Sequence, residues 1–200
     1  MHLRHFATST LVLAVAASPI AAQEHEGHDR DEGHDEAMHA EHHPDFFGDI
    51  DADLAQAESK LLGLADAIPE DAYDWRPGEG VRSVRETLLH VAADNYFIPM
   101  ALGVDAPAST GISGYMSTKA FEEQGLSKAD VKTELQASFD HLRTILKGSD
   151  PMSLGEAVNL FGMDATTQSA WILTATHLHE HLGQMIAYAR SNDVVPPRNM

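Results

Sequence analysis

Cysteine is absent from all 200 residues of this chain. Disulfide bonds therefore cannot stabilise it, and no thiolate is available as a nucleophile or as a metal ligand. The chain has 13 histidines, and imidazole nitrogen binds zinc and related divalent ions. Any soft-metal site in this chain must therefore be based on histidine.

Positive charge is also scarce. Lys and Arg number 13 against 31 Asp and Glu, which gives a formal net charge of −18. This balance argues against nucleic acid as a partner, because few basic side chains are available to neutralise phosphates. We interpret the negative charge as a contribution to solubility. The length favours one domain with accessory segments.

Long apolar runs are missing except near the N-terminus. A basic start with Arg4 precedes the run FATSTLVLAVAASPI, and the small residues IAA come before Gln23. This order predicts a signal peptide over residues 1–22, export to the periplasm or the medium, and no membrane span in the mature chain. A membrane anchor is the alternative, but it needs about 20 apolar residues, and this run is shorter and interrupted by polar residues.

Residues 23–45 consist almost wholly of His, Asp, Glu, Gly and Ala. Such a composition buries too little apolar surface to offset chain entropy, so we predict a disordered tether. A tract of this kind either collects divalent metal loosely or serves only as a solvated linker. Its six histidines are His25, His28, His34, His39, His42 and His43.

The remaining residues, 46–200, predict one helical domain. Apolar spacing of three and four residues, with Ser caps and Pro or Gly stops, predicts four helices. The connector at 103–126 is rich in Gly, Ser and Thr and predicts a long loop with a short helical turn, whereas EAVNLF in the next connector could be extended. We therefore expect an all-α fold, a four-helix bundle with long inter-helix loops. The predicted helices cover Phe47 to Ile68, Ser83 to about Leu102, Ser127 to about Lys147 and Ala165 to Ser191.

The last helix carries three histidines in THLHEHLGQMIAYAR, residues 176–190. His177 and His181 are four apart and share one face, whereas His179 points away from both. Imidazoles at this spacing can converge on one ion, as they do in HExxH sites. The HExxH general base is missing, since Leu178 follows His177, so that class of protease is excluded.

A third ligand is available in His90, which lies mid-helix among Leu88, Leu89 and Val91. Burying this ring is costly unless its nitrogens are bound. In a bundle it could meet the pair on the last helix and leave one position open, as in catalytic zinc sites. The alternative is an ordinary buried histidine beside a chance HxxxH. His141, flanked by charged residues, is interpreted as a surface residue.

Three further residues are candidates for catalysis. Asp94 lies one turn after His90 and could orient a ligand or take a proton. Gln184 and Tyr188 continue the face of the HxxxH pair and could orient substrate. The alternatives are a solvent-facing aspartate, a glutamine that makes a helix-packing hydrogen bond, and a tyrosine anchored in the core.

The chain resembles the DinB/YfiT-like family of metal-dependent helical bundles over about residues 47–197. The resemblance rests on Trp75 and Pro77 in ADAIPEDAYDWRP, on SVRETLLHVAADNYF, on HLHEHLGQMIAYAR and on the closing VVPP. It implies a four-helix bundle with His90, His177 and His181 as ligands of Zn²⁺ or Ni²⁺. Trp75 either walls the pocket or packs its loop onto the bundle.

The resemblance also implies an activity on small molecules, because characterised members of the family include thiol-dependent transferases and isomerases. The signal peptide and the His-rich tether depart from the family pattern, and cytosolic thiols are scarce outside the cell. We therefore expect an exported metal-dependent hydrolase or transferase that activates water or a thiol toward an unknown small molecule, as a monomer or a homodimer. The alternatives are a non-catalytic metal-binding or delivery protein and an interaction module with incidental histidines.

Overall fold

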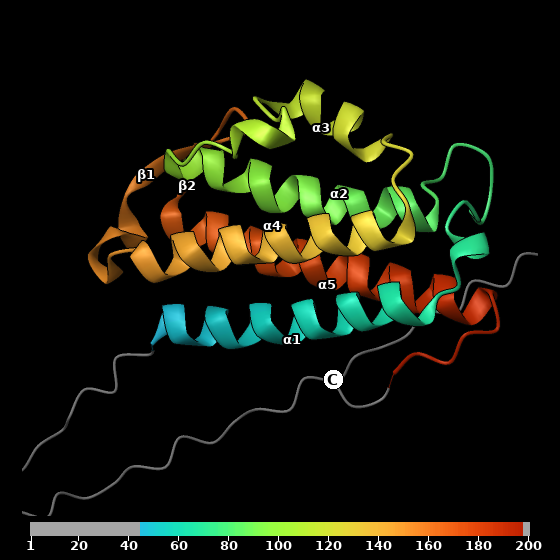
Figure 1. Cartoon of the computed structure of the whole chain (residues 1–200). Helices are drawn as coiled ribbons and strands as arrows, with labels where there is room; N and C mark the ends of the chain where they lie inside the picture. Colours follow the sequence, from blue (N-terminus) through green and yellow to red (C-terminus); the bar gives the residue numbers. More distant parts are fainter. Residues whose placement is uncertain (1–44, 198–200) are drawn as a thin grey trace, which may run out of the picture. The chain divides into compact units, whose positions relative to one another are not determined.

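The computed structural model describes residues 45–197 and confirms an all-α bundle (Figure 1). The predicted signal peptide and nearly all of the His-rich tether lie outside these residues. None of the helices described is both long and apolar enough to cross a bilayer. The elements are α1 Phe46–Ala67, α2 Val84–Phe97, α3 Tyr115–Glu122, α4 Lys128–Gly148, β1 Ala157–Leu160, β2 Met163–Thr166 and α5 Thr167–Ser191.

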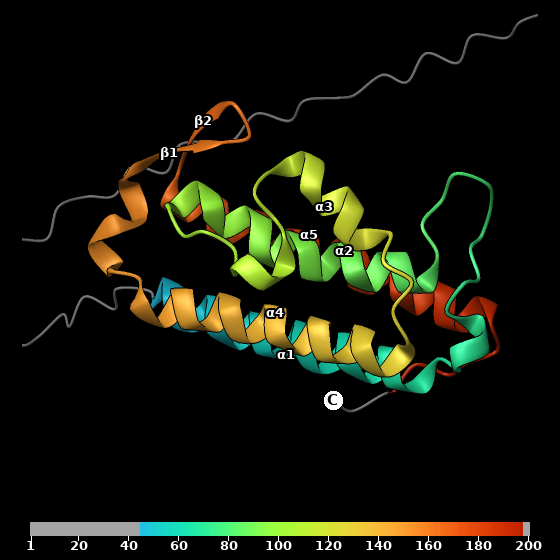
Figure 2. The ribbon, with the colours of Figure 1, turned by 45° about the horizontal axis from the view of Figure 1, so that its top comes forward.

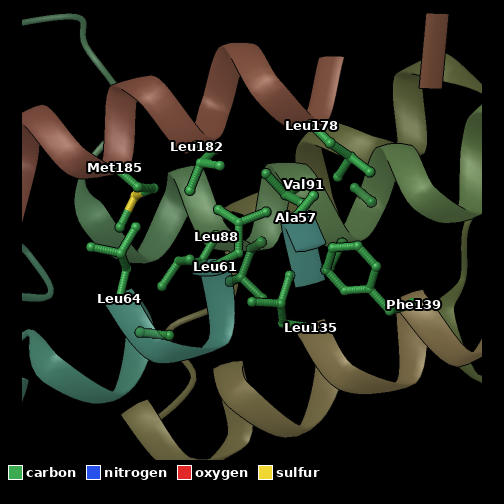
Figure 3. Close-up of a cluster of buried hydrophobic side chains, with 14 of the residues drawn as sticks. Ala57, Leu61, Leu64, Leu88, Val91, Leu135, Phe139, Leu178, Leu182 and Met185 are labelled. Atoms are coloured by element: carbon green, nitrogen blue, oxygen red, sulfur yellow. The ribbon is translucent and has the colours of Figure 1, made fainter. Parts of the chain in front are cut away.

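Four long helices, α1, α2, α4 and α5, form the bundle, and the short helix α3 lies against α2 on its outer side (Figure 2). The apolar stripe predicted on α1 is its buried face, with Leu54, Leu61 and Leu64 at most 1% exposed. Side chains from all four helices meet in the core shown in Figure 3. Burial of these stripes is the main driving force for assembling the bundle.

Two helix boundaries differ from the sequence prediction. α2 ends at Phe97 and continues as a 3₁₀ turn to Leu102, so the predicted end is wrong. The reason is Pro99, which has no N–H to donate to the preceding turn. α5 begins at Thr167, because the residues before it pair with β1 in an antiparallel hairpin. The predicted cap at Ser83 is confirmed, since its side chain and that of Glu86 bond each other's backbone N–H.

The β1–β2 hairpin is closed by only two residues, Phe161 and Gly162. Their φ angles are +57° and +88°, and the pair Leu160 and Met163 flanks them. Positive φ at both positions is the pattern of a type I′ turn, which favours Asn or Gly at the first position. A residue with a Cβ atom, such as Phe, is less stable by about 1–2 kcal/mol in this left-handed backbone conformation.

Three C-terminal carbonyls of the α1 end are satisfied by side chains from outside the helix. Pro69 cannot donate to the carbonyl of Ala65, and the hydroxyl of Tyr73 donates to it instead, at 2.6 Å. Lys128 donates its ammonium group to the carbonyls of Asp66 and Ile68. The start of α4 is thereby tied to the end of α1.

Candidate metal centre

Three histidines from α2 and α5 meet on the inner side of the bundle. The ligand nitrogens of His90, His177 and His181 all lie within 4.8 Å of one another. The Nε2 atoms of His90 and His177 are 3.2 Å apart. Two nitrogens bonded at 2.0–2.1 Å to one tetrahedral ion lie about 3.3–3.4 Å apart, so this spacing suits a shared ion.

His90 is held by a buried carboxylate on α3. Its Nδ1 lies 2.8 Å from Oε1 of Glu122, and Arg82 donates from Nε to Oε2 of Glu122 at 2.7 Å. Burial raises the pKa of Glu122, but hydrogen bonds from His90 and Arg82 outweigh it and lower the pKa below its usual value. The carboxylate is therefore ionised and accepts the Nδ1 proton, which leaves the Nε2 lone pair of His90 free.

His181 is held by a chain of hydrogen bonds along α5. Its Nδ1 donates to Oε1 of Gln184 at 2.7 Å, Gln184 donates to the hydroxyl of Tyr188, and Tyr188 donates to the carbonyl of Arg82. Burial, together with the nearby His177, lowers the pKa of His181 to about 4. This ring is therefore neutral near pH 7, with its Nε2 lone pair available.

Asp94 lies on the open side of the three histidines. Its Oδ2 is 3.0 Å from Nε2 of His177 and 3.6 Å from Nε2 of His90. These are the nitrogens that face the shared position, so Asp94 lies beside that position and not behind a ligand. From there the carboxylate can accept a proton from a molecule in the adjoining pocket.

An open pocket of about 1300 Å³ adjoins the three histidines, with His90, His177, Asp94 and Gln184 among the residues that line it. Its other walls come from α3, from the hairpin turn and from the loop before α2. Trp75 packs edge-to-face on Tyr188, with ring centroids 5.3 Å apart, so it fastens its loop to the bundle.

His141 on α4 and His179 on α5 lie outside the three-histidine cluster. His179 is exposed on α5, and its Nε2 pairs with Oδ1 of Asp53 at 2.8 Å, in agreement with the predicted helical face. His141 is half-buried against Tyr96, with ring centroids 5.3 Å apart, so the interpretation as a plain surface residue is wrong. Burial lowers the pKa of His141.

The sequence matches the model of the DinB superfamily over residues 53–185. The chain belongs to the DinB superfamily. The matched region contains His90, His177 and His181. No curated protein is significantly similar to the chain.

Solved structures of other proteins, among them two DinB-like proteins, share this fold. A DinB-like protein from Bacillus cereus ATCC 10987 is 12% identical, with a TM-score of 0.63 over 76% of this chain and 95% of its own. A DinB-like protein from Bacillus subtilis is 17% identical, with a TM-score of 0.57 over 74% and 93%. An uncharacterised protein from Escherichia coli UTI89 is 14% identical, with a TM-score of 0.56 over 76% and 97%. At these identities the likeness shows the bundle fold alone.

Sequence reasoning missed two residues of this DinB-superfamily site, Glu122 and Arg82. The connector at 103–126 is predicted to be a long loop with a short helical turn, and that turn is the eight-residue helix α3. Thr118, Phe121 and Glu122 are the buried residues of that helix. Their spacing of three and four positions is the signal that could have placed Glu122 on the inner face. Nothing in the local sequence indicates that Arg82 reaches it.

Replacing Glu122 by glutamine is expected to weaken Zn²⁺ binding by about 10–100-fold, because His90 loses the ionised acceptor that orients its ring. Competition with a chromophoric chelator measures the affinity. Glu123→Gln is the matched control, since Glu123 is exposed and pairs with the equally exposed Lys119. Equal affinities of the two variants would contradict a supporting role for Glu122.

Proposed function

We propose that this protein is exported and binds one divalent ion, Zn²⁺ or Ni²⁺, through His90, His177 and His181, as a metal-dependent hydrolase or transferase. The observation that carries the proposal is the convergence of three imidazoles whose ligand nitrogens lie within 4.8 Å of one another. When bound, an ion held by neutral imidazoles lowers the pKa of a water or thiol ligand and supplies a nucleophile near neutral pH.

The residues of the chain suit this donor set. The Nδ1 atoms of His90 and His181 are occupied by Glu122 and Gln184, so that Nε2 is the nitrogen that each ring has left to bind an ion. Imidazoles in this tautomer are the ligands that zinc and nickel prefer when thiolates are absent.

In this proposal Asp94 accepts the proton that the nucleophile releases, because its carboxylate lies 3.0 Å from Nε2 of His177 and also lines the pocket. Gln184 and Tyr188 position His181 through the hydrogen-bond chain described above. Their predicted role in orienting substrate stays a prediction. Gln184 is the better placed of the two, since it also lines the pocket.

Three ligands beside an open pocket favour catalysis over a structural metal site, because structural sites are closed by a fourth protein ligand. A metal-delivery protein is the second candidate. The observation that favours it is the acidic tract at 23–45 with six histidines, which could pass ions to the bundle. Export itself is proposed from the signal-peptide pattern.

Metal analysis of two chains tests the proposal. A chain that starts at Asp45, retained because it caps α1 by accepting from the N–H of Gly48, is expected to bind one Zn²⁺. The chain that includes residues 23–44 is expected to bind further ions loosely. Both are purified without a His tag. A truncated chain that binds no metal would overturn the proposal.

Turnover separates the enzyme from the delivery protein. The zinc-loaded chain is tested on p-nitrophenyl esters and on thiol transfer to 1-chloro-2,4-dinitrobenzene. If it is an enzyme, Asp94→Asn is expected to lower turnover by about 100-fold or more while the zinc content stays at one per chain. Tight binding of one ion without turnover on any substrate would favour delivery.

A further inference from the structure

The pocket beside the histidines has an aromatic wall made by Phe97, Tyr115 and Phe161. The rings of Phe97 and Phe161 are stacked, with centroids 4.8 Å apart and planes at 18°, and Phe97 also contacts Tyr115 at 6.2 Å. The three residues come from the end of α2, the start of α3 and the hairpin turn. Segments far apart in sequence thus place three rings side by side on one pocket wall.

The backbone at Phe161 is unfavourable for this residue. Its φ of +57° favours Asn or Gly, so the backbone conformation of the turn does not explain an aromatic side chain at this position. The side chain is 48% exposed and lines the pocket, so its burial in the core is not the reason for its presence. An aromatic side chain kept in a strained turn beside a pocket indicates a role in binding.

The charged residues of the same pocket do not favour an anionic ligand. Arg82 pairs with Glu122, Arg76 with Glu86, and Lys119 with Glu123. Each cation that lines the pocket therefore has a carboxylate partner. Two apolar side chains at the pocket, Tyr115 and Met116, are 74% and 82% exposed. Apolar and aromatic walls of this kind bind uncharged flat groups.

The distance between the wall and the histidines sets the shape of the ligand. His90, Asp94 and Phe97 lie on one face of α2, at intervals of four and three residues. Seven residues of α-helix span about 10 Å along the axis. A ligand that reaches both places needs its flat group separated from its reacting group by a linker of several bonds.

We propose that the aromatic wall of Phe97, Tyr115 and Phe161 binds a flat, uncharged, apolar group of the substrate, while the polar reacting group of the same molecule lies at the three histidines. This inference rests on the proposed metal-dependent function. It narrows the substrate class to small molecules that carry an aryl or similar planar group on a short linker.

Hydroxamic acids on the full chain with one equivalent of Zn²⁺ test the proposal, because the hydroxamate chelates the ion and the rest of the probe reaches the wall. The probes are acetohydroxamic acid, 4-phenylbutyrohydroxamic acid and octanohydroxamic acid. Calorimetry is expected to show the phenyl probe binding about ten-fold more tightly than the acetyl probe and about three-fold more tightly than the flexible octanoyl probe. His177→Ala measures binding to zinc held outside the site.

Phe161→Asn is the decisive variant, since Asn suits the turn and the fold is kept. This variant is expected to lose most of the affinity that the phenyl probe gains over the acetyl probe, while the affinity for the acetyl probe stays unchanged. Its melting temperature is expected to be no lower than that of the parent chain. Met163→Thr, an exposed change on the same hairpin, is expected to leave all three affinities unchanged.

The outcomes distinguish this inference from the proposed function. If no hydroxamate binds in a His177-dependent way, the proposed function and the inference both fail. If the acetyl probe binds at the site but the phenyl probe binds no more tightly than the octanoyl probe, the inference alone is overturned. It is also overturned if Phe161→Asn keeps the full gain.

Discussion

Zinc affinity is expected to fall by more than about 100-fold when His177 is replaced by alanine, beyond the 10–100-fold loss typical for a group that only supports a ligand. The physical reason is that His90 and His181 remain as a pair, and two imidazoles hold an ion weakly. Chelator competition on the chain that starts at Asp45 measures this affinity without the His-rich tract.

Thermal unfolding gives a second measure of the same change. Zinc at about 100 times its dissociation constant stabilises a protein by about 2.7 kcal/mol. For a domain of this size that corresponds to a rise of about 5–10 °C in the melting temperature. The unchanged chain is expected to show this rise on addition of zinc, and His177→Ala is not.

His179→Ala is the matched control on the same helix. His179 is exposed and pairs with Asp53, so its loss is expected to change zinc affinity less than about two-fold. If His177→Ala kept the affinity of the unchanged chain, or if His179→Ala lost as much, the three-histidine centre would be wrong.

Leu178→Ala is expected to lower the stability of the fold without a comparable loss of zinc affinity. Leu178 lies next to His177 in sequence but is fully buried in the core, within the cluster shown in Figure 3. Truncating a buried leucine removes its transfer free energy and leaves a cavity, which together cost about 2–5 kcal/mol. Urea unfolding of the metal-free chain measures the free energy of unfolding.

The zinc affinity of folded Leu178→Ala is expected to stay within about three-fold, because the other bundle contacts still hold α2 against α5. Ile172→Ala on the same helix serves as the control, since Ile172 is 47% exposed and its loss should cost less than about 1 kcal/mol. A stability loss below about 1 kcal/mol for Leu178→Ala would contradict the packing described for α5.

His177→Ala and Leu178→Ala separate metal binding from folding, because α5 presents different faces to the core and to the pocket. Leu178 and Leu182 point to the core, and His177 and His181 point to α2 beside the pocket. Adjacent residues on a helix are about 100° apart around its axis. Neighbours in sequence therefore serve different purposes on this helix.

Local sequence signals located most of the helices correctly. The apolar stripe of α1, the Ser83 capping box and the Ser127 cap act within a few residues, and each is present in the structure. The signals were misread where two of them competed. Pro99 ends the α-helix within a run that otherwise favours it, and the hairpin takes residues that helix propensity alone assigns to α5.

The candidate site shows the same division between local and long-range information. The spacing of His177 and His181 follows from helical geometry and is readable from one segment. Glu122, by contrast, reaches His90 across 32 positions, and Arg82 reaches Glu122 across 40. No periodicity within one helix encodes contacts between residues so far apart in sequence, because these contacts depend on how α3 packs on α2.

By itself, the sequence determined that any soft-metal site must use histidine, that four amphipathic helices would pack together, and that two histidines share a face of the last one. Only the tertiary structure decided that His90 meets that pair, that Glu122 and Gln184 orient the rings, and that three aromatic side chains line the pocket. The helical repeat sets positions along one segment, whereas contacts between segments arise from the packing of the whole core.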